Sequence, residues 1–300
     1  MTPLTQDFPS CNHSFLKEAV LLAKMEKCSS IFFFQDTFTT AIPSNELPEE
    51  KGLKWIIVTQ QAQEASHQGS HYILPIRLFA NGRMTQLRSA ILLALLHHYI
   101  DDNDRVGCLG GLPHSDQLDT FLWFEVKREI SPIFSQASDL LPAHVLPEVF
   151  ERVLSLATEL AVEGREGKPI GCLFILGESK NLSPFVQPLV LNPFFGYSAN
   201  DRNILQPSID ETIKEYALLD GAFIINGNGI LESAGSLVKI NERIALPGGF
   251  GTRHAAAIAI SKAIDCLAIT VSSSTRQVTL FRNGNMFPML TKGIGCSNAE

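Results

Sequence analysis

The chain has 300 residues and a net charge of −7, and apolar residues make up 45% of it against 18% for charged residues. This composition allows a sizeable core, and the length suffices for two ordinary domains. The acidic balance argues against broad binding to DNA or RNA, which requires clustered lysine and arginine.

The first half of the chain predicts alternating strands and helices. Its opening residues, 1–14, lack the basic segment and long apolar core of a signal peptide. Short apolar runs then predict buried parallel strands, and one longer segment has the apolar spacing of a helix. The predicted strands are 29–36, 53–60, 104–111 and 118–126, and the predicted helix is 83–100. Strands and helices in this order predict an α/β sandwich over residues 1–128.

The longest apolar run, residues 89–100, is too short to span a bilayer and carries two histidines. Six cysteines are scattered without a Cys-x-x-Cys pair, as expected of thiols in a reducing compartment. We therefore expect a cytoplasmic protein that binds neither membranes nor nucleic acids.

A segment richer in proline and serine predicts a linker at 129–143, and residues 144–300 predict a second domain. There we expect a mixed β-sheet with helices on its faces. Asn-Gly pairs within 220–238 indicate a hairpin between two β-rich segments. The other predicted strands are 170–178, 266–272 and 277–284, and the predicted helices are 147–168, 210–219 and 251–264.

The sequence LPGGFGTRHAAAIAIS, residues 246–261, places glycines in front of a predicted helix. Glycines allow close approach of a ligand, Thr252 can cap the helix, and exposed amides at a helix N-terminus favour an anion. Arg253 adds a forked cation suited to phosphate. The alternative is a glycine turn that only starts a helix, since the loop matches neither a Walker A motif nor a dinucleotide fingerprint.

Three further features have both functional and structural interpretations. Asp220, at a helix-to-strand junction, could bind a divalent metal beside a nucleotide or simply form a turn. The glycine-rich residues 107–119 could cover a small ligand or close a turn. A third group suggests a metal cluster or a polar helix exit: His97, His98, Asp101, Asp102 and Asp104.

Several motifs in the second half occur together: REGKPIGCLFILGE, LVLNPFFGY, RNILQPSIDETIKEYALLDGAFII and LPGGFGTRHAAA. In this order they resemble diadenylate cyclases, over about residues 145–284. The segments WIIVTQ and RMTQLRSAILLALL fit more loosely the front domain of an archaeal-type form, which is pyruvate-kinase-C-like.

The resemblance implies an enzyme that joins two ATP molecules into cyclic di-AMP and releases two pyrophosphates. It implies a face-to-face homodimer, in which each protomer holds one ATP. By this resemblance Asp220 would bind Mg²⁺ or Mn²⁺ and act in catalysis with Arg253. The implied nucleotide-binding residues are Gly221, Ala222, Gly251, Thr252, Arg253, His254 and Ser272.

The chain departs from the family's usual Arg-His-Arg motif, since Ala255 occupies the third position. It also has Ser273 and Ser274 where many relatives carry a charge. Arg276 or Arg282 could replace the missing cation. Two alternatives to a working cyclase therefore stay open: a catalytically impaired nucleotide sensor, and a structural or partner-binding module with a vestigial site.

Overall fold

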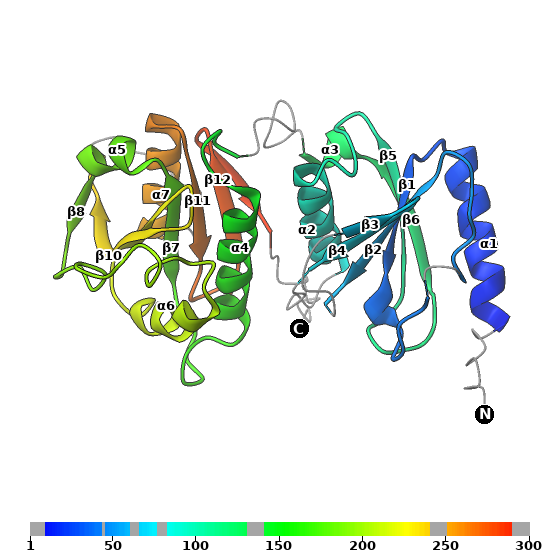
Figure 1. The fold of residues 1–300 in the computed structure, drawn as a ribbon, viewed down its shortest axis with the longest axis horizontal. Helices are drawn as coiled ribbons and strands as arrows, with labels where there is room; N and C mark the ends of the chain where they lie inside the picture. Colours follow the sequence, from blue (N-terminus) through cyan, green and yellow to red (C-terminus); the bar gives the residue numbers. More distant parts are fainter. Residues whose placement is uncertain are drawn as a thin grey trace, which may run out of the picture. The chain divides into compact units, whose positions relative to one another are not determined.

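The structure is a computed structural model that describes residues 10–43, 46–60, 66–76, 83–130, 141–240 and 251–289 (Figure 1). The chain divides into two compact units, Met1–Leu78 with Leu87–Ser131, and Phe79–Gln86 with Pro132–Glu300. Each unit is built on its own sheet. The predicted α/β class is confirmed, whereas the residue limits of the domains and of the linker stay predictions.

The first sheet has six strands in the order β3-β4-β2-β1-β5-β6. Strands β4, β2, β1 and β5 are parallel, and the two outer strands run antiparallel to their neighbours. The strands are β1 (Ser30–Phe34), β2 (Lys54–Thr59), β3 (Ser66–Gln68), β4 (His71–Pro75), β5 (Arg105–Gly110) and β6 (Thr120–Glu125). The helices are α1 (Ser10–Met25), α2 (Arg83–Leu96) and α3 (Val126–Ile130).

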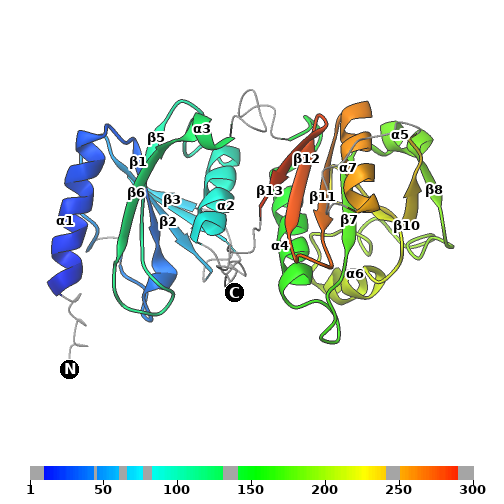
Figure 2. The ribbon, with the colours of Figure 1, turned by 180° about the vertical axis from the view of Figure 1, so that it is seen from behind.

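Helices α1 and α2 lie on opposite faces of this sheet (Figures 1 and 2). Side chains of α1 at helical spacing, such as Leu16 and Ala23, pack with Phe33 and Trp55 in one buried cluster. The central strands β1 and β2 are buried on both faces, which explains their continuous apolar runs.

The second sheet has seven strands in the order β13-β12-β11-β7-β9-β10-β8. The pair β7–β9 is parallel and every other pair is antiparallel, so the sheet is mixed as predicted. The strands are β7 (Cys172–Gly177), β8 (Val186–Pro188), β9 (Ala222–Asn226), β10 (Leu231–Val238), β11 (Cys266–Val271), β12 (Val278–Arg282) and β13 (Asn285–Pro288). The helices are α4 (Pro147–Val162), α5 (Ser179–Leu182), α6 (Asp210–Tyr216) and α7 (Thr252–Ala263).

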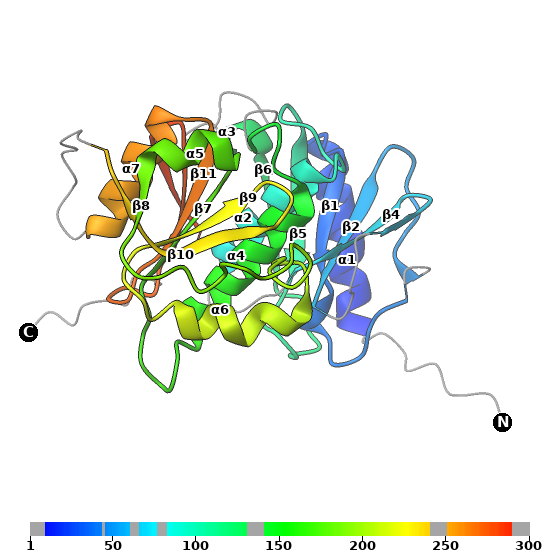
Figure 3. The same cartoon turned by 60° about the vertical axis from the view of Figure 1, so that its left-hand side comes forward.

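Helices α4 and α7 cover opposite faces of this sheet (Figures 1 and 2). Pro147 suits the first turn of α4, where a missing amide hydrogen costs no hydrogen bond. The apolar stripe of α4, which includes Val149, Val153 and Leu160, is buried. Figure 3 shows the antiparallel β9–β10 hairpin, with α6 below it in that view. The turn from α6 into β9 carries Asp220, the residue on which the site depends.

Candidate functional site

The topology of the second sheet gathers residues that are far apart in the sequence. Strands β7 and β9 are parallel, so Gly171 and Asp220, which come just before them, lie at the same end of the sheet. Strand β11 runs antiparallel to β7 and therefore finishes at that end, where Ser273 follows it. Strand pairing thus brings three separate segments of the chain to the same end of the sheet.

Arg253, the second residue of α7, reaches this place and contacts Asp220. Its Nη2 lies 3.2 Å from Oδ1 of the carboxylate, which is 95% exposed. An ion pair in contact with water contributes little to stability, so a ligand can separate it at small cost. The carboxylate and the guanidinium therefore converge on one site, where both remain available for a ligand.

Gly171 and Ser273 lie next to the guanidinium of Arg253. A Cβ atom placed on Gly171 would lie 2.9 Å from Nη1 of Arg253 and 3.4 Å from Oγ of Ser273. Glycine at position 171 therefore leaves room for the guanidinium. Nε of Arg253 is buried and has no hydrogen-bond partner in the part of the chain that the structure describes. Sequence reasoning did not single out Gly171, although its motif was part of the resemblance.

The N-terminus of α7 differs from the prediction in one respect. The capping residue is Gly251, with no side-chain cap, and Thr252 is the first residue of the helix. The expectation that Thr252 caps the helix is therefore wrong. A Cβ atom on Gly251 would meet no described residue within 4 Å. The first-turn amides and the dipole of α7 favour an anion beside Arg253. The rest of the predicted glycine loop, residues 246–250, lies outside the described residues.

His254 points into the unit. Its side chain is buried, its Nε2 lies 3.3 Å from Oγ1 of Thr270, and its ring packs edge-on against Phe281. Burial lowers the pKa of His254, because the protonated imidazolium loses its hydration there. These contacts favour a role in holding α7 on β11 and β12 over direct contact with phosphates.

Gly221 and Ala222 continue from Asp220 into β9. Gly221 has φ of +105°, and a Cβ atom there would lie 2.6 Å from the backbone nitrogen of Ser236. Glycine is therefore required for β9 to start beside β10. Ala222 is buried in the cluster beneath α7. Both residues fix the position of Asp220.

Ser272 is half-buried in the turn between β11 and β12. Its Oγ lies 3.2 Å from Oγ of Ser274 and accepts a hydrogen bond from the amide of Thr275. The hydroxyl of Ser272 therefore shapes the turn that carries Ser273.

The two arginines considered as substitutes make contacts away from this site. Arg276 donates to the carbonyl oxygen of Val162 at the end of α4. Arg282 is buried, pairs with Asp265 at 2.6 Å and donates to the carbonyl oxygen of Cys266. These contacts lie elsewhere in the unit, and Ala255 supplies no cation of its own.

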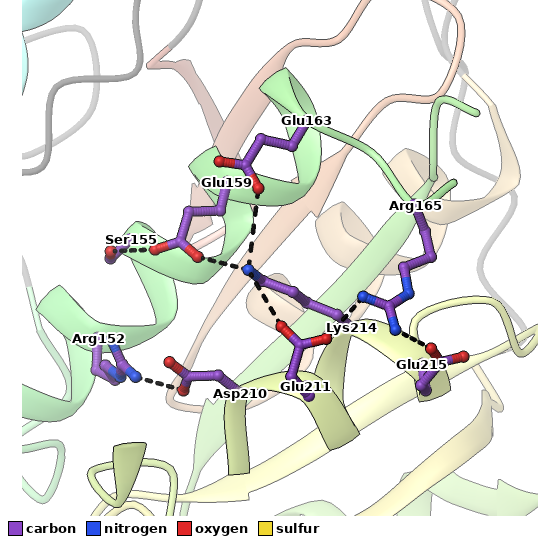
Figure 4. Close-up of polar contacts among 9 residues, drawn as sticks. All are labelled: Arg152, Ser155, Glu159, Glu163, Arg165, Asp210, Glu211, Lys214 and Glu215. Atoms are coloured by element: carbon purple, nitrogen blue, oxygen red, sulfur yellow. Dashed lines mark hydrogen bonds and ion pairs between the residues drawn. The ribbon is translucent and has the colours of Figure 1, made fainter. Parts of the chain in front are cut away.

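A network of charged side chains holds α6 against α4 (Figure 4). Nζ of Lys214 lies 3.0 Å from Oε2 of Glu159, and both side chains are mostly buried. Burial by itself lowers the pKa of Lys214, but the hydrogen bond that Lys214 donates to Glu159 and the charges of nearby carboxylates outweigh it and raise this pKa overall. Arg165 pairs with Glu211 and Glu215 at the surface. The network fixes the helix that leads into Asp220.

The chemistry of the site fits a metal ion shared with a substrate. Mg²⁺ is usually held by one or two carboxylates together with substrate phosphates and water. Asp220 offers one exposed carboxylate beside a cation suited to phosphate. Across the described ranges no group of three or more His, Cys, Asp or Glu side chains could hold a metal alone, and this includes the histidine and aspartate residues that follow α2, between positions 97 and 104.

Comparison with known proteins places this chain in a family. The chain is 31% identical over 230 residues to a diadenylate cyclase of Methanocaldococcus jannaschii, covering 76% of this chain and 74% of that protein. The chain belongs to the diadenylate cyclase family. The predicted family is thereby confirmed.

A family model matches the second half of this diadenylate cyclase family member. The family described as DisA bacterial checkpoint controller nucleotide-binding matches residues 159–286, which include Asp220 and Arg253. A diadenylate cyclase of Haloferax volcanii is 34% identical over 141 residues, covering 47% of this chain and 51% of that protein. The cyclic di-AMP synthase CdaA of Bacillus subtilis is 28% identical over 123 residues, covering 41% of this chain and 42% of that protein.

No helix in the described ranges is both long enough and apolar enough to cross a bilayer.

Proposed function

We propose that this chain is a diadenylate cyclase that converts two ATP molecules into cyclic di-AMP and two pyrophosphates. In each half of the reaction the 3′-hydroxyl oxygen of one ATP forms a bond to the α-phosphorus of the other. The bond from that phosphorus to the bridging oxygen of the β-phosphate breaks, and pyrophosphate leaves. Two such bonds close the ring, so the reaction requires two nucleotides facing each other in a two-fold dimer.

The convergence of Asp220 and Arg253 carries this proposal. In a member of this family, an exposed carboxylate next to a guanidinium suits a nucleotide with its metal ion. A bound Mg²⁺ or Mn²⁺ would neutralise phosphate charge and increase the acidity of the attacking hydroxyl. Asp220 would hold this ion and orient the 3′-hydroxyl. Arg253 and the first-turn amides of α7 would hold phosphate oxygens and stabilise the charge that develops on them.

The altered Arg-His-Ala motif supports a second candidate, a nucleotide sensor that has lost the reaction. The contacts of Arg276 and Arg282 with carbonyl oxygens and Asp265 outside this site favour this candidate, because they hold both arginines elsewhere. An arginine that stabilises transferring phosphate contributes about 10³-fold or more to the rate. The two candidates therefore differ in turnover and share nucleotide binding.

Incubation of the purified chain with ATP and Mn²⁺, followed by chromatography for cyclic di-AMP, tests the proposal. We expect product from the wild-type chain and none from Asp220→Asn, which removes the charge and keeps the shape of the side chain. Asp201→Asn is the matched control, because Asp201 lies in an exposed turn and its Oδ2 accepts a hydrogen bond from Ser198.

Titration with ATP separates the remaining outcomes. Saturable binding that Arg253→Ala abolishes, without any product, supports the sensor. Absence of both product and binding contradicts both candidates and leaves a partner-binding module.

A further inference from the structure

The two sheets have four outer strands, and three of them are protected from pairing with another chain. β3 is three residues long and polar, and β8 and β13 are short and end in proline. Short strands and proline are common means of preventing edge-to-edge association. The chain therefore limits pairing at three of the edges that the structure describes.

The fourth outer strand, β6, has no such protection. It is six residues long, with the sequence TFLWFE, and all six residues are at least partly exposed. Trp123 is 44% exposed, and its ring stacks on that of Phe121 with centroids 6.1 Å apart. Among the residues that the structure describes, β6 is paired on one edge alone, in an unbroken antiparallel register with β5. A strand of this kind is a template for a further strand.

We propose that β6 pairs antiparallel with β6 of a second copy of this chain, which joins two first units through one continuous sheet. An antiparallel pair of identical strands has two-fold symmetry, the commonest symmetry of protein dimers. The edge of β6 carries aromatic and aliphatic side chains along its length. Such side chains stabilise cross-strand pairs.

The charges around β6 favour a second copy as the occupant. Asp119 precedes the strand and accepts a hydrogen bond from Thr120, whereas Lys127 and Arg128 follow it in α3, and all three residues are exposed. Glu125, the last residue of β6, pairs with Arg105 and Arg128, so this end keeps a net positive charge. In an antiparallel pair centred on Trp123, the acidic end of each strand lies beside the basic end of the other. Self-pairing thus brings opposite charges together at both ends of the strand, which favours one orientation.

The contact has a consequence that rests on the proposed function. A reaction between two nucleotides on two protomers requires two second units to meet. Joining the first units makes that meeting intramolecular and raises its effective concentration. The dimer contact itself depends on neither ATP nor turnover, so a failure of the proposed reaction leaves it testable.

The molecular mass of the full chain in solution, measured by light scattering without nucleotide, tests the contact. We expect a wild-type dimer, and a monomer for Trp123→Lys, because a lysine on an edge strand opposes pairing. Met25→Lys is the matched control, since it makes the same kind of change at a side chain that is 69% exposed on α1. It should remain a dimer. A wild-type monomer, or an unchanged dimer in Trp123→Lys, would overturn the proposal.

Oxidative cross-linking keeps the test valid if the lysine variant fails to fold. Pairing centred on Trp123 places the two copies of this residue opposite each other, so Trp123→Cys should give a disulfide-linked dimer. Met25→Cys should not. No cross-link above that of the wild-type chain would contradict the proposed strand pairing. If the contact forms and the proposed reaction occurs, Trp123→Lys should also lower the rate most strongly at low protein concentration.

Discussion

At the scale of single residues, the site depends on Gly171, because a residue without a side chain leaves room for Arg253. Gly171→Ala places a methyl group about where the guanidinium of Arg253 now lies, 2.9 Å from Nη1. We expect about ten- to hundredfold weaker ATP binding, because a hydrogen bond to a charged group contributes about 1.5–3 kcal/mol. Isothermal titration with ATP in the presence of Mg²⁺ measures the change.

Gly177→Ala is the control for Gly171→Ala. It lies at the other end of β7, where a Cβ atom would come within 3.1 Å of Cys266 and Leu182 side chains. It should lower the melting temperature and leave ATP affinity unchanged. Equal effects of both substitutions on affinity would show that Gly171 acts only through folding.

His254 allows a prediction about pH. Burial lowers its pKa in the folded state below the unfolded value of about 6.5, so between these two values the unfolded chain binds more protons. The contribution of His254 to the stability of the folded state is therefore complete above about pH 6.5, and it is lost as the pH falls through the lower pKa of the folded state. Urea unfolding measures the free energy of unfolding at neutral and at mildly acidic pH. The difference between these two free energies should be smaller in His254→Gln than in the wild type. An unchanged difference would contradict the burial effect.

At the scale of elements, sequence prediction was most successful where a strand or helix is long and apolar. The runs that became β7 and β11 are buried at every residue, and the stripe of α4 follows the helical period. β3 and β8 are too short and polar to have a local signal, because pairing with a neighbour defines them. α1 was missed although Leu16, Ala19, Val20 and Ala23 already have helical spacing.

Within the site, too, local sequence patterns predicted single residues but not the contacts that strand pairing creates. Asp220 and Arg253 belong to local motifs and were predicted from them. Gly171 and Ser273 lie next to Arg253 because of the order of the strands, which no local sequence pattern contains. The inward direction of His254 likewise follows from the packing of α7 on β11 and β12. The sequence therefore predicted the chemical groups and left their arrangement to the fold.

The network between α4 and α6 gives a prediction about stability. Lys214→Met leaves Glu159, whose side chain is 7% exposed, without its charged partner. Breaking a buried pair in this way costs about 3–5 kcal/mol. Arg165→Met is the control and should cost under about 1 kcal/mol, since its partners Glu211 and Glu215 are largely exposed. Urea unfolding measures both changes, and similar losses would contradict the difference in burial.

At the scale of the whole molecule, the proposed chemistry requires more than one chain. Each protomer offers one Asp220 and one Arg253 at its site, whereas the product contains two nucleotides joined by two new bonds. Symmetric use of both protomers explains how one set of residues could make both bonds. Association and turnover should therefore be linked.

Mixing experiments test this link. We expect the rate per wild-type chain to fall when an excess of Asp220→Asn chain is added and partners are allowed to exchange, because most wild-type protomers then face one that lacks the carboxylate. Trp123→Lys with Asp220→Asn in one chain should inhibit less, since it lacks the proposed β6 contact. The rate of cyclic di-AMP formation at fixed wild-type concentration measures both effects. If neither chain inhibits after exchange, each protomer completes the reaction alone, and the face-to-face dimer is wrong.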